Sequence, residues 1–421
     1  MQKRAFPEQV CQLQKGGVPP AGVPVARPVP GRDQCIGRTG RPKFTSGATF
    51  PVESAIIKSY LLATPMPTTE STAAFAHVPL AEVTRGGIVE SVHLGSIAVC
   101  DHEGRLLHSA GDPTSITFTR SALKPLQALP FVAAGGVERF GFTSAQVALM
   151  CGSHSGETRH VETAADMLAK AGNIADELQC GTHPPYRFAA RGEVPPPPPY
   201  SPLANNCSGK HSGMLAYCSM CGLDKHEYLA LDHPLQQAIR AAVSTFSGTR
   251  DDALVVGIDG CSAPNYAMPL ANLAGGFARL GAASVDPTYG HAPRQLADAM
   301  TMHPEMVSGE HGADLALARA GRGDWVSKIG AEGVRAMSIR SRGWGIAIKI
   351  ADGSSRSLHA VTIATLDQLG LLDGTATQAL ASLATPQLRN FRGIPVGEIR
   401  SMFVLDKSPA SMASHAGAPA Q

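Results

Sequence analysis

The sequence is poor in aromatic and in charged residues, and neither charge is in strong excess. Phe, Trp and Tyr make up 5% of the 421 residues, and charged residues make up 17%, below the roughly 25% of an average soluble domain. The formal net charge is +2. Nucleic-acid binding needs a basic surface that neutralises phosphates and rings that stack on bases. We therefore expect no nucleic-acid partner.

Long apolar runs are also missing. No stretch approaches the roughly 20 consecutive apolar residues that a membrane-spanning helix needs, so we expect a soluble protein with no membrane partner. Nine cysteines spread along the chain do not form the dense, even-numbered pattern of a small secreted domain. We expect a reducing, cytoplasmic compartment, in which thiols are free to pack in the core or to bind a metal.

Composition divides the chain into three parts. Residues 1–50 contain eight Lys or Arg against two acidic residues, with many Pro and Gly and no periodic apolar pattern. This composition predicts a disordered extension over residues 1–79. Ordered patterns begin near Ala81, and we expect one folded domain over residues 80–406, followed by a flexible tail over residues 407–421.

Apolar runs at both ends of this domain predict strands, with helical patterns between them. The runs 88–90 and 96–100 have the length and turn signals of short antiparallel strands. The runs 145–150 and 345–350 fit either a strand or a buried helix, and residues 162–171 have apolar positions at helical spacing. The pattern predicts an α+β fold, in which terminal strands share one antiparallel sheet flanked by helices.

The sharpest local signal is Arg-Ser-Ala-Leu-Lys-Pro at residues 120–125, which contains a Ser-x-x-Lys sequence. Pro125 is tolerated only near a helix start, so Ser121 should lie at a helix N-terminus. The three-residue spacing then puts the Lys124 amine beside the Ser121 hydroxyl. Lys124 can activate this hydroxyl only when neutral, which requires a pKa lowered by roughly 3 units. The alternative is a helix cap followed by a solvated lysine.

A second lysine and a second serine extend this pattern. Lys328-Ile329-Gly330 follows an extended run and resembles the Lys-Thr-Gly strand of serine beta-lactamases and penicillin-binding proteins. Between the two lysines lies Gly-Ser-His-Ser-Gly at residues 152–156, where one of the two serine hydroxyls could pair with Lys328. The alternative for Lys328 is a surface lysine on an edge strand. The nucleophile elbow of α/β-hydrolases is excluded, because His154 occupies the position of its serine.

Two polar segments carry candidate metal ligands. Residues 205–213 are a run of small polar groups that opens a helix, and residues 259–264 follow an apolar strand. Cys207, Lys210 and Cys261 could together hold a zinc ion with one open position, although lysine is a rare zinc ligand. The alternative is a set of free thiols.

Taken together, these segments resemble the L-asparaginase II family, the Rhizobium-type asparaginases. The fold of that family is similar to that of the serine beta-lactamases, and the resemblance covers residues 81 to about 404. The blocks that carry it are Arg85-Gly86-Gly87, Glu90-Ser91, Gly111-Asp112-Pro113, Arg120-Ser121, Lys124-Pro125, Cys151-Gly152-Ser153-His154, Cys180-Gly181, His183, residues 205–213, Asp259-Gly260-Cys261, His303-Pro304-Glu305-Met306, residues 328–333 and residues 345–353.

The resemblance implies hydrolysis of the side-chain amide of L-asparagine to L-aspartate and ammonia through a covalent acyl-enzyme. In this interpretation residues 80–406 are the catalytic domain. Ser121 would be the nucleophile and Lys124 its base, and Ser153 with Lys328 would form a second pair that relays protons. Lys349 is a further candidate for the second lysine.

The resemblance also implies a cofactor and partners. One zinc ion per chain would bind Cys207, Lys210 and Cys261. The charged α-amino and α-carboxylate groups of the substrate would meet Arg120, His211 and Asp259, and the chain would form a homodimer. Two other functions stay open at this point: a beta-lactamase-like peptidase or amidase, and a non-catalytic zinc-binding scaffold.

Overall fold

The structure is a computed structural model, and it describes residues 76–282 and 285–408. The described residues belong to one compact unit. The predicted extension over residues 1–79 and the predicted tail over residues 407–421 lie almost entirely outside them.

Helices and strands alternate irregularly along the chain. The strands are β1 (Val78–Arg85), β2 (Ile88–Asp101), β3 (Leu106–Ala110), β4 (Ile116–Phe118), β5 (Val255–Ile258), β6 (Pro264–Pro269), β7 (Trp325–Gly330), β8 (Val334–Ile339), β9 (Trp344–Ile350), β10 (Gln387–Arg389), β11 (Pro395–Ser401) and β12 (Asp406–Lys407). The helices are η1 (Arg120–Leu123), which is a 3-10 helix, α2 (Lys124–Ala133), α3 (Gly136–Phe140), α4 (Ser144–Cys151), α5 (Thr158–Lys170), α6 (Tyr186–Arg191), α7 (Ser208–Cys221), α8 (Pro234–Ser247), α9 (Leu270–Gly281), α10 (Ala292–Met302), α11 (Pro304–Ser308), α12 (Ala313–Gly321), α13 (Leu358–Gln368) and α14 (Gly374–Ala384).

The main sheet of the described residues has nine strands, and its central path runs β10-β11-β1-β2-β9-β8-β7. Every pairing in it is antiparallel, and β1 near the start of the domain pairs with β11 near its end, with Ala81 opposite Ser401. The predicted α+β fold with terminal strands in one antiparallel sheet is therefore confirmed. The two short strands predicted at 88–90 and 96–100 are wrong in one respect, because β2 is continuous across both.

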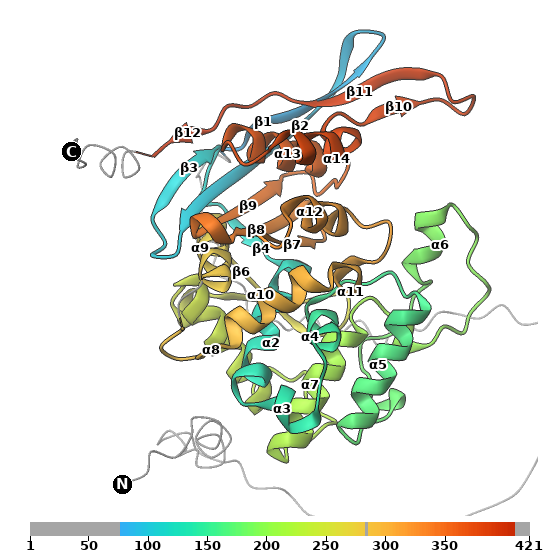
Figure 1. Cartoon of the computed structure of the whole chain (residues 1–421), viewed down its shortest axis with the longest axis vertical. Coiled ribbons are helices and arrows are strands. Elements are labelled where there is room, and N and C mark those ends of the chain that lie inside the picture. Colours follow the sequence, from blue (N-terminus) through green and yellow to red (C-terminus); the bar gives the residue numbers. More distant parts are fainter. Residues whose placement is uncertain (1–75, 283–284, 409–421) are drawn as a thin grey trace, which may run out of the picture. The chain divides into compact units, whose positions relative to one another are not determined.

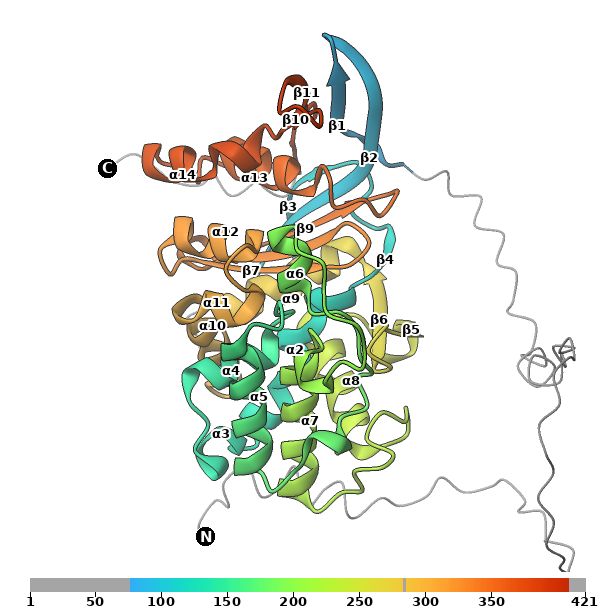
Figure 2. The same ribbon diagram turned by 90° about the vertical axis from the view of Figure 1, so that its right-hand side faces the viewer.

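The two faces of this sheet differ in side-chain size. Large side chains such as Ile97, Ile346 and Ile348 point into a core shared with α13 and α14. Small side chains such as Ala98 and Ala347 point to the opposite face, which packs in a separate core with the central helices. Alternation along each strand separates the two sets. Figures 1 and 2 show the result, with α13 and α14 over one face and α9 beneath the other.

Close approach of α9 to the sheet explains the small residues. A methyl group added at Gly345 in β9 would lie 1.8 Å from the Ala274 carbonyl oxygen in α9. No side chain fits in that space, so the strand has glycine where it crosses the helix. The helix carries glycine and alanine along its length for the same reason.

A second, three-stranded sheet in the order β4-β6-β5 leads into the region described below. β4 ends at Phe118, and η1 begins two residues later and continues into α2. The ambiguous run 145–150 is the buried helix α4, which begins at a capping box between Thr143 and Gln146. Among residues 76–282 and 285–408, no helix combines the length and the apolar character needed to cross a membrane.

Candidate active site

Three chain segments meet around the hydroxyl of Ser153. η1 and the first turn of α2 supply Lys124, the loop after α4 supplies Ser153, and β7 supplies Lys328. Lys124 Nζ lies 2.9 Å from Ser153 Oγ, and Lys328 Nζ lies 3.0 Å from the same oxygen. Both lysines are buried, with 1% and 0% of their surface exposed. Lys328 is therefore not the surface residue that an edge strand would allow.

Backbone carbonyls hold the two amines in place. Lys124 Nζ donates to the Gly152 and Asn206 carbonyl oxygens at 2.5 and 3.0 Å, and Lys328 Nζ donates to the Ile329 carbonyl oxygen at 2.7 Å. A neutral amine has two N–H donors and one lone pair. With two carbonyls as acceptors, a neutral Lys124 has its lone pair left for the proton of the Ser153 hydroxyl.

Two ammonium groups beside one oxygen would repel each other in a buried site. The pKa of Lys328 is lowered to about 7: burial is the main cause, the charge of Asp314 opposes it, and the charge of Lys124 adds to it. The arrangement therefore favours one amine and one ammonium that share the Ser153 hydroxyl at neutral pH.

A buried ion pair lies behind Lys328. Asp314 in α12 accepts hydrogen bonds from the Ser327 hydroxyl at 2.7 Å and the Ile329 N–H at 2.8 Å, and Arg335 Nη1 lies 2.5 Å from its carboxylate. Burial alone raises the pKa of Asp314, but the charges of Arg335 and Lys328 hold it below its usual value. Sequence reasoning missed this pair, because a buried Asp and a buried Arg 21 residues apart form no local motif.

Ser121 lies in the first turn of η1, as the position of Pro125 predicts. Its side chain is half-buried, and within the described residues its hydroxyl makes no hydrogen bond. The amine predicted to lie beside it, that of Lys124, is hydrogen-bonded to Ser153 instead. The preceding residue, Arg120, has a left-handed backbone with φ of 48°.

Arg120 and Asp259 form an ion pair at the edge of a surface cleft. Arg120 Nε lies 2.9 Å from Asp259 Oδ1, and Arg120 Nη1 lies 3.8 Å from a Glu332 carboxylate oxygen. Apolar side chains of β4 and β5 form part of the wall of the cleft, which has a volume of about 440 Å³. Lys349 also lines it, and its Nζ donates to the Glu332 carbonyl oxygen. Of the two candidates for the second lysine, the one that contacts Ser153 is Lys328.

His211 does not join the Arg120–Asp259 pair. Its side chain is fully buried in α7, with Nδ1 2.7 Å from the Tyr228 hydroxyl. Burial lowers its pKa to about 4, so the ring is neutral at physiological pH.

Cys207, Lys210 and Cys261 converge at the start of α7, although β5 and α7 are far apart in sequence. Lys210 Nζ lies 2.9 Å from Cys261 Sγ. The hydrogen bond from the Cys207 thiol, together with the Lys210 charge, holds the pKa of Cys261 well below its ordinary value. Burial by itself lowers the pKa of Lys210, but the thiolate raises it above the ordinary value.

The chemistry of this cluster suits a soft metal ion. A thiolate, a thiol and the Lys210 ammonium group, which would lose a proton on binding a metal, meet with little solvent. His211 beside Cys261 has an Nε2 atom without a hydrogen-bond partner among the described residues. Across residues 76–282 and 285–408, no group of three His, Cys, Asp or Glu side chains could hold a metal ion. Any ion here would therefore need Lys210 among its ligands, as the sequence predicts.

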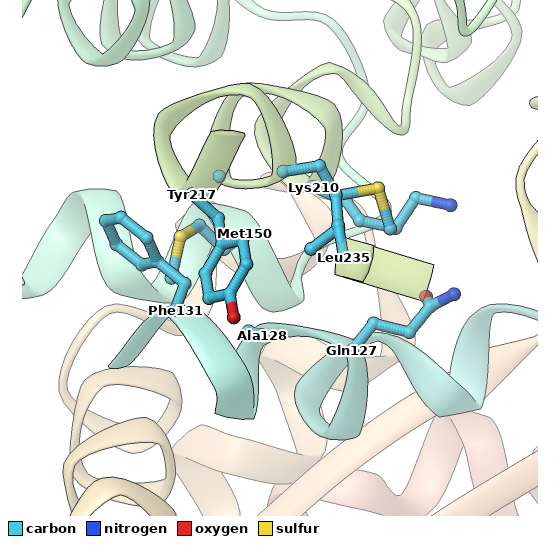
Figure 3. A pocket seen from close by; sticks show the side chains of 9 residues that line it. Gln127, Ala128, Phe131, Met150, Lys210, Tyr217 and Leu235 are labelled. Atoms are coloured by element: carbon cyan, nitrogen blue, oxygen red, sulfur yellow. The ribbon is translucent and has the colours of Figure 1, made fainter. Parts of the chain in front are cut away.

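A small internal cavity adjoins Lys210 on the other side. It lies among α2, α4, α7 and α8 and measures about 10 Å³, which is room for about one water molecule. Figure 3 shows Lys210 and Gln127 on one side of it and the rings of Phe131 and Tyr217 on the other. A cavity of this size cannot hold a substrate, so the cleft beside Arg120 is the better candidate for access to the site.

Several solved structures are similar to this chain. A protein described as Mglu in its native form has 16% identity and a TM-score of 0.37, and the match covers 66% of this chain and 65% of that chain. This chain thus spans just under two thirds of the length of Mglu. A beta-lactamase from Mycobacterium bovis has 16% identity and a TM-score of 0.36, with 65% and 94% of the two chains covered.

Comparison with curated proteins gives no match. The family model described as L-asparaginase II matches residues 81–401, which include each of the side chains described around Ser153, Arg120 and Cys261. The chain therefore belongs to the L-asparaginase II family.

Proposed function

We propose that this protein is an L-asparaginase, which hydrolyses the side-chain amide of L-asparagine to L-aspartate and ammonia through a covalent acyl-enzyme. One observation carries the proposal beyond family membership. The buried amines of Lys124 and Lys328 lie 2.9 and 3.0 Å from one hydroxyl, that of Ser153. Lys124 is three residues after Ser121, so this proton-transfer group begins on the turn that carries the proposed nucleophile.

In the proposed acylation step, Ser121 Oγ forms a bond to the amide carbon, and its proton passes to a neutral Lys124. The Ser153 hydroxyl exchanges protons with both lysines, so that a neutral Lys328 can take the proton of Lys124 and leave Lys124 neutral, and it delivers one proton to the leaving nitrogen. The C–N bond breaks, and the NH₂ group leaves with that proton as ammonia. Positioned proton transfer of this kind contributes about 10²–10⁴-fold to rate.

Deacylation reverses the proton movement. A water oxygen attacks the acyl carbon, and one of its protons enters the same group of amines and hydroxyl. The bond from the carbonyl carbon to Ser121 Oγ breaks, Ser121 regains a proton, and L-aspartate leaves. A lysine that is neutral near pH 7 is required in both steps, which agrees with a pKa of about 7 for Lys328.

Arg120 and Asp259 are the proposed contacts for the charged ends of the substrate. Their ion pair at 2.9 Å offers a cation for the α-carboxylate and an anion for the α-amino group. His211 has no such role in this proposal, because it is buried and neutral.

The proposed cofactor is one zinc ion held by Cys207, Lys210 and Cys261. The convergence of two sulfurs and the Lys210 amino group, which would lose a proton on binding, supports this ligand set. When bound, zinc would supply a fixed positive charge beside the substrate region. Arg120 and Asp259 bind the substrate whether or not this charge is present.

The test is ammonia release from L-asparagine and L-glutamine by the parent protein and by the Ser121→Ala variant. We expect release from asparagine by the parent and a loss of at least 10³-fold in the variant, since the nucleophile is removed. Ser219→Ala is the matched control, because Ser219 is also half-buried and is hydrogen-bonded to Asn173 away from the site. Full activity in the Ser121→Ala variant would exclude Ser121 as the nucleophile.

The same experiment separates the other functions. Covalent labelling of Ser121 by a fluorescent penicillin, without ammonia release, would indicate a beta-lactamase-like peptidase. No ammonia from either amide and no labelling would indicate a non-catalytic scaffold. The homodimer and the cytoplasmic location stay predictions, for sedimentation and cell fractionation to test.

A further inference from the structure

The backbone immediately before Ser121 has a conformation that its own side chain does not favour. Arg120 has φ of 48°, in the left-handed region that residues other than glycine seldom adopt without support. Two other non-glycine residues also have a positive φ. Ser262 directly follows Cys261, and Glu332 has a carboxylate oxygen 3.8 Å from Arg120 Nη1. Left-handed residues thus gather around the candidate active site.

Asn265 in β6 supplies the support for Arg120. Its Oδ1 accepts the Arg120 N–H at 3.0 Å, and its Nδ2 donates to the Arg120 carbonyl oxygen at 3.0 Å. The side chain is buried, with 2% of its surface exposed. A single amide thus satisfies both backbone polar groups of the left-handed residue.

The contact continues the pairing of two strands. β4 pairs with β6 as far as Phe118 opposite Ala267, and the Thr119 N–H and hydroxyl both donate to the Tyr266 carbonyl oxygen at 3.1 and 2.9 Å. At the next residue the backbone of β6 is replaced as partner by the Asn265 side chain. The chain can therefore leave the sheet at Arg120 and turn into η1 without losing hydrogen bonds.

We propose that Asn265 is a positioning residue for the nucleophile: by binding both backbone groups of Arg120, it fixes the turn that presents Ser121. The inference rests on the proposed role of Ser121. The Ser121 hydroxyl makes no hydrogen bond within the described residues, so its direction depends on the backbone around it. On one side that backbone is held by the Ala122 N–H on the Thr119 carbonyl oxygen at 3.1 Å, and on the other side it is held by Asn265.

The proposal needs an amide and no other group of that size. A carboxylate at position 265 could accept the Arg120 N–H, but it would face the Arg120 carbonyl oxygen without a proton to donate. Alanine would leave both backbone groups without this partner. Asn265→Asp is therefore the sharper variant, because it keeps the volume and one of the two bonds.

The experiment compares the full-length parent with Asn265→Asp and Asn265→Ala. It measures kcat and KM for L-asparagine, thermal unfolding, and the rate at which diisopropyl fluorophosphate modifies Ser121, followed by peptide mass spectrometry. We expect kcat and the modification rate to fall together by about 10- to 100-fold, as a misplaced nucleophile requires, with KM within about threefold. Asn272→Ala is the control. Like Asn265, Asn272 donates a hydrogen bond from its amide, here to Thr249 Oγ1, but it is half-buried and lies away from Arg120.

Four outcomes would overturn the inference. The first is a folded Asn265→Asp variant with parental kcat and parental modification rate. The second is a modification rate of Ser121 that falls only in proportion to the unfolded fraction in both variants, which would mean a purely structural role. The third is a rise in KM alone.

The fourth outcome concerns the parent. If its Ser121 is not modified, the nucleophile assignment fails and the inference with it. If Ser121 is modified but asparagine is not hydrolysed, only the proposed substrate fails, and the modification rates still test Asn265.

Discussion

At the scale of single residues, the unusual feature is a lysine buried without a direct carboxylate contact. Lys328 has 0% of its surface exposed, and its Nζ contacts a hydroxyl and a carbonyl. Burial lowers its pKa from 10.5 to about 7, so the folded state resists protonation. Below pH 7 the lysine is charged in both folded and unfolded states, and the full cost of burial is present. The cost decreases as the pH rises from 7 towards 10.5.

Lys328→Met should therefore lower the activity and raise the stability of the fold. We expect kcat/KM for L-asparagine to fall by about 10²–10⁴-fold, while the free energy of unfolding at pH 7 rises by about 1–4 kcal/mol because a buried charge is removed. Urea unfolding at pH 7 and pH 10 measures this, and the gain should shrink at the higher pH. A variant that is less stable at pH 7 would contradict the expected cost of burial.

The pH dependence of activity should report the same group. Loss of a proton from Lys328 gives the group formed by Lys124, Ser153 and Lys328 the neutral amine that the Ser121 proton needs, so kcat/KM should increase with pH through about 7. The charge of Asp314 raises the pKa of Lys328, so Asp314→Asn should move this midpoint to lower pH. The measurement is the pH profile of kcat/KM for the folded fraction. Movement to higher pH would show that Asp314 does not act through its charge.

The sequence predicted the residues whose spacing is local and missed those whose contacts are distant. Ser121 and Lys124 are separated by one helical turn, so a Ser-x-x-Lys before a proline was enough to place them at a helix start. Asn265 and Asp314 contact the site only through the tertiary fold, and neither lies in a recognisable motif. The resemblance implies that His211 meets the substrate, whereas its ring is fully buried in α7, and burial of this kind is not visible in a run of polar residues.

At the scale of elements, the close packing of β7 against η1 brings Lys328 to the turn that carries Ser121. A methyl group added at Gly330 would lie 2.9 Å from the Thr119 carbonyl oxygen and 3.3 Å from the Ala122 nitrogen. Gly330, the last residue of β7, therefore contacts the turn on both sides of Arg120 and Ser121. Glycine at this position sets the separation of the two elements.

Gly330→Ala should push the strand and the turn apart. We expect kcat to fall by about 10- to 100-fold and the free energy of unfolding to fall by about 1–3 kcal/mol from overpacking. Gly374→Ala is the matched control, since a methyl group there meets no atom within 4 Å, and it should leave kcat unchanged. Steady-state kinetics and urea unfolding of both variants decide the matter, and a Gly330→Ala variant with parental kcat would argue against a tight strand–turn contact.

The sequence identifies some helices and strands and leaves others undecided, because only some of them have a visible polar and apolar period. The helical spacing of residues 162–171 predicts α5 to within a few residues of its ends, because an amphipathic helix shows its period in the sequence. The run 145–150 fits either a strand or a helix, since a helix buried on all sides has no polar stripe to show its period. β2 was divided in two because its exposed half carries polar residues.

At the scale of the whole molecule, the two sulfurs and Lys210 join α7 to the loop after β5. An ion held there would bind the folded state and not the unfolded chain, and it would add about 2.7 kcal/mol of stability at 100 times its dissociation constant. This is the contribution that the proposed zinc would make.

The parent protein should therefore contain about one zinc ion per chain, with a lower unfolding temperature after chelation. Cys261→Ala should lose the metal, whereas Cys218→Ala should keep it, because Cys218 is a buried free thiol elsewhere in α7. Elemental analysis by mass spectrometry and thermal unfolding with and without chelator measure this. Equal zinc content in the two variants would rule out the proposed ligand set.

The pairing of β1 with β11 has a consequence for biosynthesis. During synthesis β1 is joined on one side by β2 soon after both are made, but its other side waits for residues near 400. During that interval its free backbone groups are open to any extended segment nearby. Nascent chains are therefore exposed to aggregation until β11 has been made, and ribosome stalling before that point should increase it.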